Sequence, residues 1–204
     1  MSNSRPLAYD RVNLFGPTAV NLLAAGDADL LVLNDEDTKF IPTSIVLETA
    51  YARGTTATDP VVVADIGTTG TNLTSSLTIT DALDNQGTSN TLALLANAPV
   101  VTGSRSVRLH KTTVGAGQAT ATRSRTSGVA TIVTGAVHGF STGDTITIAS
   151  MTDTTFNDVQ AEITVTSTTA FTYANAGVDV VSGADTAGRV GALYVNAYVV
   201  GIYY

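Results

Sequence analysis

The stretch VGALYVNAYVVGIYY, residues 190–204, decides the fold class of this chain. Successive side chains of a β-strand point to opposite faces, and here both faces are largely apolar. Tyr198 and Val200 lie on one face, whereas Leu193 and Val199 lie on the other. A strand that is apolar on both faces is typical of a central strand covered on both sides. We therefore predict a central strand that pairs with strands from the first half of the chain.

The remaining sequence is also of strand type. Short runs of Val, Ile, Thr and Tyr alternate with clusters of Gly, Asn, Asp and Ser, which is the pattern of strands joined by turns. Helical periodicity is weak, and the best helix candidate spans residues 90–98. We predict an all-β fold, a jelly-roll-like β-sandwich. Besides the final strand, its strands are expected at residues 28–33, 39–52, 61–66, 73–80, 100–111, 129–134, 145–148, 160–166 and 171–173.

Two stretches of small residues, 112–128 and 182–191, have the composition of connectors. Between them lies a compact block of short strands. We predict a main β-sandwich from residues 1–123 plus 189–204, with a small β-barrel or sandwich domain, residues 124–188, inserted into it. Insertions of this kind are tolerated because domain termini often lie close together. The alternative is a tandem arrangement, which would leave the final strand inside the second domain.

The composition excludes several classes of function. The net charge is −7, whereas nucleic-acid binding domains carry clustered Lys and Arg on a basic surface. The absence of cysteine excludes thiol catalysis and Cys-based zinc sites. No apolar stretch is long enough for a membrane-spanning helix, and no signal peptide is visible at the N-terminus. We expect no cofactor, no nucleic-acid partner and no membrane contact.

One interval of this acidic chain is basic. No Asp or Glu occurs between Asn85 and Gly143. The interval is consistent with a docking strip for an acidic partner or another copy of the chain. It is equally consistent with a solvated strand edge, where basic residues discourage unwanted pairing. The strip consists of Arg105, Arg108, Lys111, Arg123 and Arg125.

No motif favours an enzyme. VVVADIGTTGTN, residues 61–72, is similar to the first phosphate loop of the actin, Hsp70 and sugar-kinase superfamily, but the chain lacks the alternating helices of an α/β fold. We interpret it as a strand ending in a Gly-rich turn. The acidic run at 34–37 lacks the spacing of an EF-hand loop and is interpreted as a polar turn. His110 and His138 lie in unrelated segments, and no nucleophile-elbow motif accompanies them.

Residues 128–177 resemble a small β module that recurs in bacteriophage virion and tail-associated proteins. In that module a strand leads to His-Gly-apolar and Gly-Asp, then to an alternating strand, Phe-Asn-Gly, a further strand and Thr-Phe-x-Tyr. This chain departs from the pattern at Asp158, where the module usually has Gly. Apart from the resemblance, we expect Phe156, Phe171 and Tyr173 to form the core of this small domain. The matching residues are His138, Gly139, Phe140, Gly143, Asp144, Ile146, Ile148, Phe156, Asn157, Phe171 and Tyr173.

The flanking part is similar to phage capsid decoration proteins, in the segment FIPTSIVLETA, residues 40–50, and in the final strand, residues 193–204. The resemblance implies a virion structural protein on the capsid surface, made in the host cytoplasm. It would cement neighbouring copies of the major capsid protein, as a homo-oligomer with a trimer favoured. The alternatives are a tail or fibre component that binds a host surface glycan, and a glycan hydrolase with converging carboxylates in a cleft.

Overall fold

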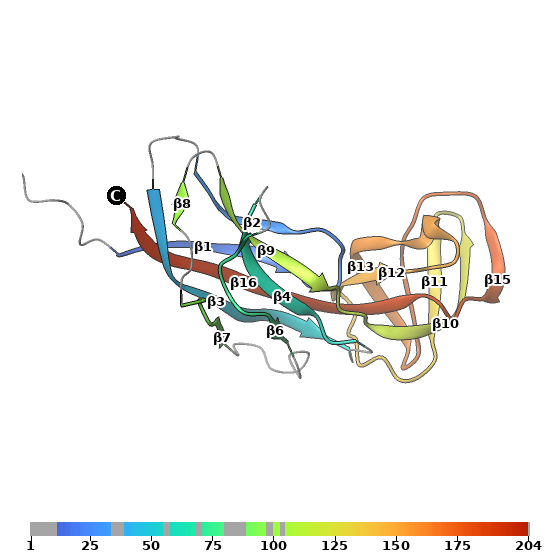
Figure 1. Cartoon of the computed structure of the whole chain (residues 1–204). Helices are drawn as coiled ribbons and strands as arrows, with labels where there is room; N and C mark the ends of the chain where they lie inside the picture. Colours follow the sequence, from blue (N-terminus) through green and yellow to red (C-terminus); the bar gives the residue numbers. More distant parts are fainter. Residues whose placement is uncertain are drawn as a thin grey trace, which may run out of the picture.

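The computed structural model describes residues 12–33, 39–54, 58–67, 71–79, 89–96, 100–102 and 105–203 of the chain. It is built from antiparallel strands with one short 3-10 helix, η2, Thr154–Phe156. The prediction of an all-β, sandwich-like fold is confirmed. Figure 1 shows a broad sandwich at one end of the molecule and a compact barrel at the other, with the long strand β16 running through both.

The first sheet of the sandwich is organised around β16, Arg189–Tyr203. This strand pairs with β1, Val12–Asn21, on one side and with β3, Lys39–Arg53, on the other. The strands β7, Ser89–Leu92, and β8, Val101–Thr102, pair with the outer edge of β3. The final strand therefore lies between strands of the first half of the chain, as the sequence predicts.

The second sheet packs against the first. It contains β2, Ala28–Val32, β9, Ser106–Thr113, and β4, Val61–Ile66, in that order. Two short strands extend it, β5, Thr71–Asn72, and β6, Leu77–Thr78, both paired with β4. The facing sides of the two sheets form one largely aliphatic core. The burial of this apolar surface is the driving force for the association of the sheets. Its largest fully buried side chains are Leu22, Phe40, Ile45, Leu47, Ile66, Leu73, Leu92 and Leu109.

The two faces of β16 are not covered equally. Leu193, Val195 and Val199 on the inward face are at most 1 % exposed, whereas Tyr198 and Val200 on the other face are only partly buried. The expectation that both faces are covered is wrong for this part of the strand. The second sheet packs against one face, and no described element of the sandwich lies over the other.

The barrel is closed by a strand that it shares with the sandwich. Its strands follow the order β10, Gln118–Thr126, β11, Val129–Thr134, β14, Ala170–Ala174, β13, Asp158–Ser167, and β12, Thr145–Ala149. The N-terminal end of β16 pairs with β12 on one side and with the start of β10 on the other, which completes the ring. A further strand, β15, Val180–Ala184, pairs with the second half of β10.

The barrel has a separate core that is richer in aromatic residues. Phe156, Phe171 and Tyr173 all lie in it, each at most 3 % exposed. The same cluster includes Val190 and Ala192 of β16, which lie beyond the predicted inserted range of 124–188. The division of the chain into domains stays a prediction, but the two cores are distinct and meet along β16. The other buried members of the second core are Ala130, Ile132, Phe140, Ile146, Ile148, Met151, Ala161 and Ile163.

Three segments that were not expected to be strands contain strand residues. The expected connector 112–128 contains β10, which pairs with β11, β15 and β16. The expected connector 182–191 contains the end of β15 and the start of β16. The helix candidate 90–98 contains strand β7, which pairs with β3, and residues 97–98 lie outside the described part. In each case a pairing partner distant in sequence overrides the local composition.

Candidate interaction surface

The face of the first sheet that the second sheet does not cover is the most distinctive surface of the molecule. Val12 and Leu14 of β1 are 63 % and 65 % exposed and lie opposite Ile202 and Val200 in the strand register. We call this surface the outward face. It consists of Val12, Leu14, Ile41, Val46, Tyr198, Val200 and Ile202.

The outward face carries almost no charge. The sequence has no charged residue within 12–21, 40–47 or 190–203, which cover β1, most of β3 and nearly all of β16. The charges of β3 lie toward its ends, at Lys39 on one side and at Glu48 and Arg53 on the other. Glu48 accepts a hydrogen bond from the Tyr198 hydroxyl at 3.3 Å. A contiguous apolar surface of this kind marks an interaction site more often than an ordinary exterior.

The sequence did not reveal this surface for two reasons. The strand β1 was not predicted, although Val12 and Leu14 flank the polar Asn13 in an alternating pattern. The apolar residues of β16 on this side were assigned to a covered face. Alternation gives the two faces of a strand, but it does not say which of them a second layer covers.

The predicted basic strip is divided between the two parts of the molecule. Arg108 and Lys111 lie on β9 of the sandwich, whereas Arg123 and Arg125 lie on β10 of the barrel. Arg105 comes just before β9, and its carbonyl accepts the Leu33 N–H at 2.9 Å. The five residues therefore do not form one continuous surface.

Arg108 is held by carboxylates of its own chain. Its guanidinium makes two parallel bonds to the buried Asp65, of 2.9 and 2.8 Å, and a third contact of 3.1 Å to Asp27. His110 Nδ1 lies 2.8 Å from Asp27. Burial opposes the shift, but the hydrogen bonds from His110 and the Lys111 N–H, with the charges of His110 and Arg108, lower the pKa of Asp27.

Lys111 is engaged by carbonyl groups. Its ammonium donates to the carbonyl oxygens of Asn21 and Ala24 at 2.9 and 2.8 Å. Burial lowers the pKa of Lys111, and the charge of Asp27 partly offsets this effect. The amine fastens the end of β1 to the second sheet, which is a structural role.

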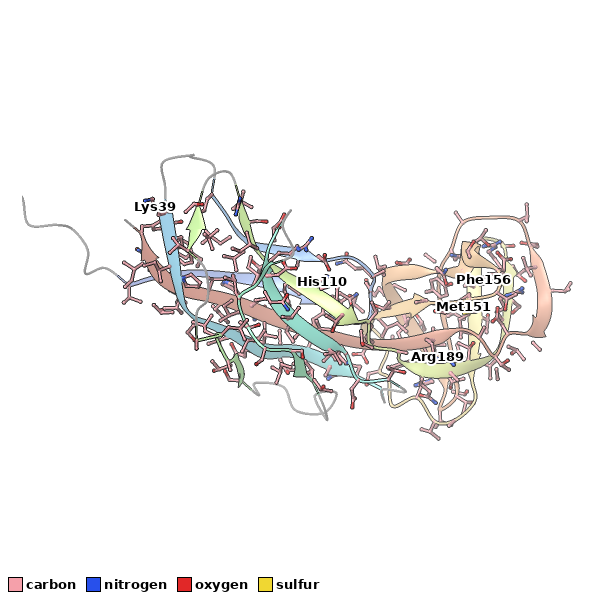
Figure 2. The ribbon with its side chains drawn as sticks, viewed as in Figure 1. Lys39, His110, Met151, Phe156 and Arg189 are labelled. Carbon is pink, nitrogen blue, oxygen red and sulfur yellow. The ribbon has the colours of Figure 1, made fainter. Side chains whose placement is uncertain are left out.

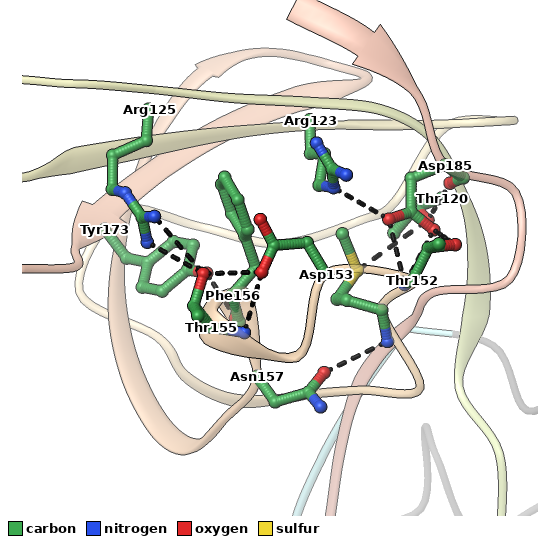
Figure 3. Close-up of polar contacts among 11 residues, drawn as sticks. Thr120, Arg123, Arg125, Thr152, Asp153, Thr155, Phe156, Asn157, Tyr173 and Asp185 are labelled. Carbon is green, nitrogen blue, oxygen red and sulfur yellow. Dashed lines mark hydrogen bonds and ion pairs between the residues drawn. The ribbon is translucent and has the colours of Figure 1, made fainter. Parts of the chain in front are cut away.

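The two arginines of β10 point into the barrel (Figure 3). Arg123 Nε lies 2.9 Å from a carboxylate oxygen of Asp185, whose side chain is fully buried. Arg125 is 3 % exposed and donates to loop oxygens. Both guanidinium groups stack over the Phe156 ring, at 5.1 and 4.7 Å from its centroid. Four of the five predicted docking cations are thus committed to contacts within the chain, which argues against the strip as a docking surface.

The segment that is similar to a phosphate loop, residues 61–72, takes part in the hydrogen bonds of Arg108. Asp65, the acidic residue of the motif, lies in β4 and is paired with Arg108. The strand turns back through β5, whose Asn72 pairs with Asp65. Residues 68–70 of the motif and the acidic run 34–37 lie outside the described residues.

The histidines are parts of the fold. His138 is 2 % exposed and stacks on Phe140, with ring centroids 4.8 Å apart. Its Nδ1 accepts the Phe140 N–H at 2.9 Å, so Nε2 carries the proton and donates to the Ser167 carbonyl at 3.0 Å. His110 is bound to Asp27 on the surface of the sandwich, where Figure 2 labels it.

The residues that match the phage module all have structural roles in the barrel. Asp144 accepts the Ser141 N–H at 2.8 Å and closes the turn before β12. Asn157 accepts the Met151 N–H at 3.0 Å, beside the buried Phe156. Asp158 accepts the Gln160 N–H at 2.9 Å. Its φ is not positive, so this position does not require the glycine that the module usually has.

The barrel is fastened to the end of the sandwich by a polar joint. Arg53 Nε lies 3.5 Å from Asp144, while Asn21 donates to Thr147 at 2.7 Å. Burial, together with the hydrogen bond and charge of Asp144, raises the pKa of Tyr51 to about 12. The Tyr194 hydroxyl donates to the Val159 carbonyl at 2.9 Å. These contacts join the two ends of the molecule beyond the continuity of the chain.

Among the described residues, no group of three His, Cys, Asp or Glu side chains converges to hold a metal ion. No helix in the described part is long and apolar enough to cross a membrane. Comparisons with protein-family models, with curated proteins and with solved structures find no match to this chain.

Proposed function

We propose that this chain is a structural protein of a virus particle that binds the assembled capsid through the outward face. The observation that carries the proposal is the uncharged, apolar surface of β1, β16 and β3, where Val12 and Leu14 are more than half exposed. The chain has a net charge of −7, so its charged surfaces would repel another acidic protein. An uncharged surface avoids this repulsion. The phage assignment comes from the resemblance of residues 128–177 to a virion module.

The mechanism would be thermodynamic. A protein that binds only the assembled shell stabilises that state by mass action, with a free energy that rises with its concentration relative to Kd. The outward face would lie across neighbouring copies of the major capsid protein, and apolar area removed from water would supply the affinity. A homo-oligomer, with a trimer favoured, would place several outward faces where neighbouring capsid subunits meet.

The glycan-binding alternative has less support. Sugar recognition by stacking needs an accessible aromatic side chain, because the apolar face of a sugar ring packs on an aromatic ring. Between residues 124 and 188 the aromatic residues are Phe140, Phe156, Phe171 and Tyr173, and each is at most 7 % exposed. The exposed large side chains of the barrel are valines, so the capsid-binding proposal is preferred.

The test is to add the purified chain to empty capsids of the same phage and to follow their thermal disassembly. The wild-type chain should bind and raise the disassembly temperature. Leu14→Glu and Val200→Glu place a charge on the outward face and should each weaken binding by about tenfold or more. The matched control is Val32→Glu, on β2 of the other sheet, where Val32 is also half-exposed.

Two outcomes would overturn the proposal. The first is a wild-type chain that neither binds nor stabilises the capsids. The second is a control variant that weakens binding as much as Leu14→Glu does. Light scattering is measured on the same proteins. If Leu14→Glu dissociates an oligomer and leaves capsid binding intact, the outward face is an interface between copies of the chain, and capsid docking through it is excluded.

A further inference from the structure

The far end of the barrel presents a second, separate surface. The loop between β14 and β15, residues 175–179, and β15 itself form the end of the molecule opposite to the chain's C-terminus (Figure 1). Val178 and Val181 are 80 % and 90 % exposed, the two highest values for large hydrophobic residues in the described part. We call residues 175–182 the tip. It does not belong to the outward face.

The tip is held in shape by Arg125. The Arg125 Nε–H donates to the Val178 carbonyl at 2.8 Å, and Nη1 donates to the Asn175 side-chain oxygen. The Asn175 N–H donates to the Gly128 carbonyl at 2.8 Å. Asp179 accepts the Ser127 N–H at 2.8 Å. The backbone of the tip is therefore tied to the β10–β11 hairpin at several points.

Arg125 holds the tip from inside the barrel. The side chain is almost fully buried, and no carboxylate among the described residues lies within ion-pair distance of its guanidinium. Its two terminal nitrogens donate to the Thr155 hydroxyl at 3.2 Å, and that hydroxyl donates to the Asp153 carboxylate at 2.6 Å, so a negative charge lies one hydroxyl away (Figure 3). The tip contributes little burial to the fold, since Val178 and Val181 point to solvent. A buried side chain that orders an exposed apolar segment lowers the entropy that this segment loses on binding, which favours a binding surface.

Gly177 completes the arrangement. A Cβ at this position would lie 2.7 Å from Arg125 Cζ and 2.9 Å from Nη2. Such distances are too short for non-bonded atoms, so a larger residue would push the guanidinium away from the loop. The close approach of the loop to Arg125 therefore depends on glycine.

The charge around the tip indicates what kind of partner fits it. Between residues 124 and 188 the sequence has six carboxylates, and Arg125 is its one Lys or Arg. Asp144 and Asp185 are paired with Arg53 and Arg123. The other four carboxylates belong to Asp153, Asp158, Glu162 and Asp179. Two of these border the tip: Asp179 is part of it, and Asp153 bonds the Thr155 hydroxyl, while the Thr155 carbonyl accepts the Asn175 side-chain amide at 3.0 Å. The border of the tip is therefore acidic and favours a cationic partner.

We propose that the tip is a contact site for a protein segment that offers apolar side chains flanked by Lys or Arg. Val178 and Val181 would fill the apolar part of the contact, and the carboxylates of Asp153 and Asp179 would meet the cations at its rim. Arg125 is a positioning residue, which sets the shape of the tip and does not touch the partner.

The experiment is an NMR titration of the full-length isotope-labelled chain with two synthetic peptides. Both contain the same Leu-Val-Leu core, flanked by lysines in one peptide and by glutamates in the other. The lysine peptide should shift the amide signals of residues 175–182, and its affinity should fall with added salt. The glutamate peptide should bind at least about tenfold more weakly. Equal binding of both peptides, or shifts confined to other parts of the chain, would overturn the proposal.

Variants separate the tip from the rest of the barrel. The double substitution Val178→Ser, Val181→Ser should abolish the shifts, whereas the matched control Val137→Ser, at another exposed valine of the barrel, should retain them. Gly177→Ala should weaken the lysine peptide by about tenfold while the signals of β4 and β9 in the sandwich stay unchanged. Unchanged affinity in Gly177→Ala would show that Arg125 does not pre-organise the tip. Loss of binding in Val137→Ser would show that the contact is not specific to it.

Discussion

The sandwich and the barrel solve the same problem, the closure of a hydrophobic core, in different ways. The sandwich encloses a mainly aliphatic core between two sheets, and its cation Arg108 lies on the outside against Asp65. The barrel is small and has few apolar residues, so its core is completed by two arginines stacked on Phe156 (Figure 3). The stems of long cationic side chains supply apolar surface where a small core lacks it. The cations of the sandwich thus pair with carboxylate and carbonyl oxygens outside its core, whereas those of the barrel are part of its core.

The largest effect on stability is expected from removing the Phe156 ring, on which the two arginines stack. Phe156→Ala should destabilise the barrel by about 3–5 kcal/mol, because it creates a cavity and leaves Arg123 and Arg125 without their stacking partner. Figure 2 shows Phe156 within the barrel, remote from Lys39 at the opposite end of the sandwich. Hydrogen exchange should lose protection in β11, β13 and β14 while β4 and β9 remain protected. An equal loss in both regions would show that the two cores unfold as one unit.

A smaller effect should distinguish the two arginine–carboxylate pairs. Both carboxylates are buried, but Asp185 also accepts the Thr152 N–H, and its partner Arg123 is less exposed, at 16 %, than Arg108, the partner of Asp65, at 27 %. Asp185→Asn and Asp65→Asn should each cost about 1–3 kcal/mol, with the barrel variant at the upper end. Urea unfolding curves measure both. A larger cost for Asp65→Asn would contradict the view that the barrel depends more on its polar network.

The smallest effect concerns pH and should be confined to the sandwich. The fold lowers the pKa of Asp27 below its ordinary value of 3.8, so the folded state favours the carboxylate form. The stability that this residue contributes is therefore present above pH 3.8 and is lost as the pH falls through the lowered pKa. In Asp27→Asn the stability of the sandwich should decline less steeply below pH 4, as followed by thermal unfolding. An identical acid profile in wild type and variant would contradict this assignment.

Much of the local structure was predictable. Alternation and β-branched residues located β4 and β11 to the residue, and they placed β3, β12, β14 and β16 within one residue at each end. Strand β10 was missed because its composition of Thr, Ala and Arg has no apolar alternation of its own. Its strand conformation comes from pairing with β11, β15 and β16.

The candidate sites were less predictable. The charge pattern of residues 105–125 suggested one basic strip, but the fold turns Arg108 toward Asp65 and Arg125 toward the tip. Neither partner is close in sequence, so no spacing rule could find it. The outward face and the tip both contain ordinary strand and loop residues, whose exposure is a property of the packed molecule.

The sequence by itself determined the all-β class, the central place of the final strand and the aromatic residues of the second core, because alternation and residue type act over a few positions. The tertiary structure decided which face of β16 is covered, how β16 closes the barrel and which cations are neutralised. These outcomes depend on partners more than 40 residues apart, such as Arg108 with Asp65 and Arg123 with Asp185. The local alternation of residues predicts the strands. Packing against elements distant in sequence determines which strand surfaces stay exposed to a partner.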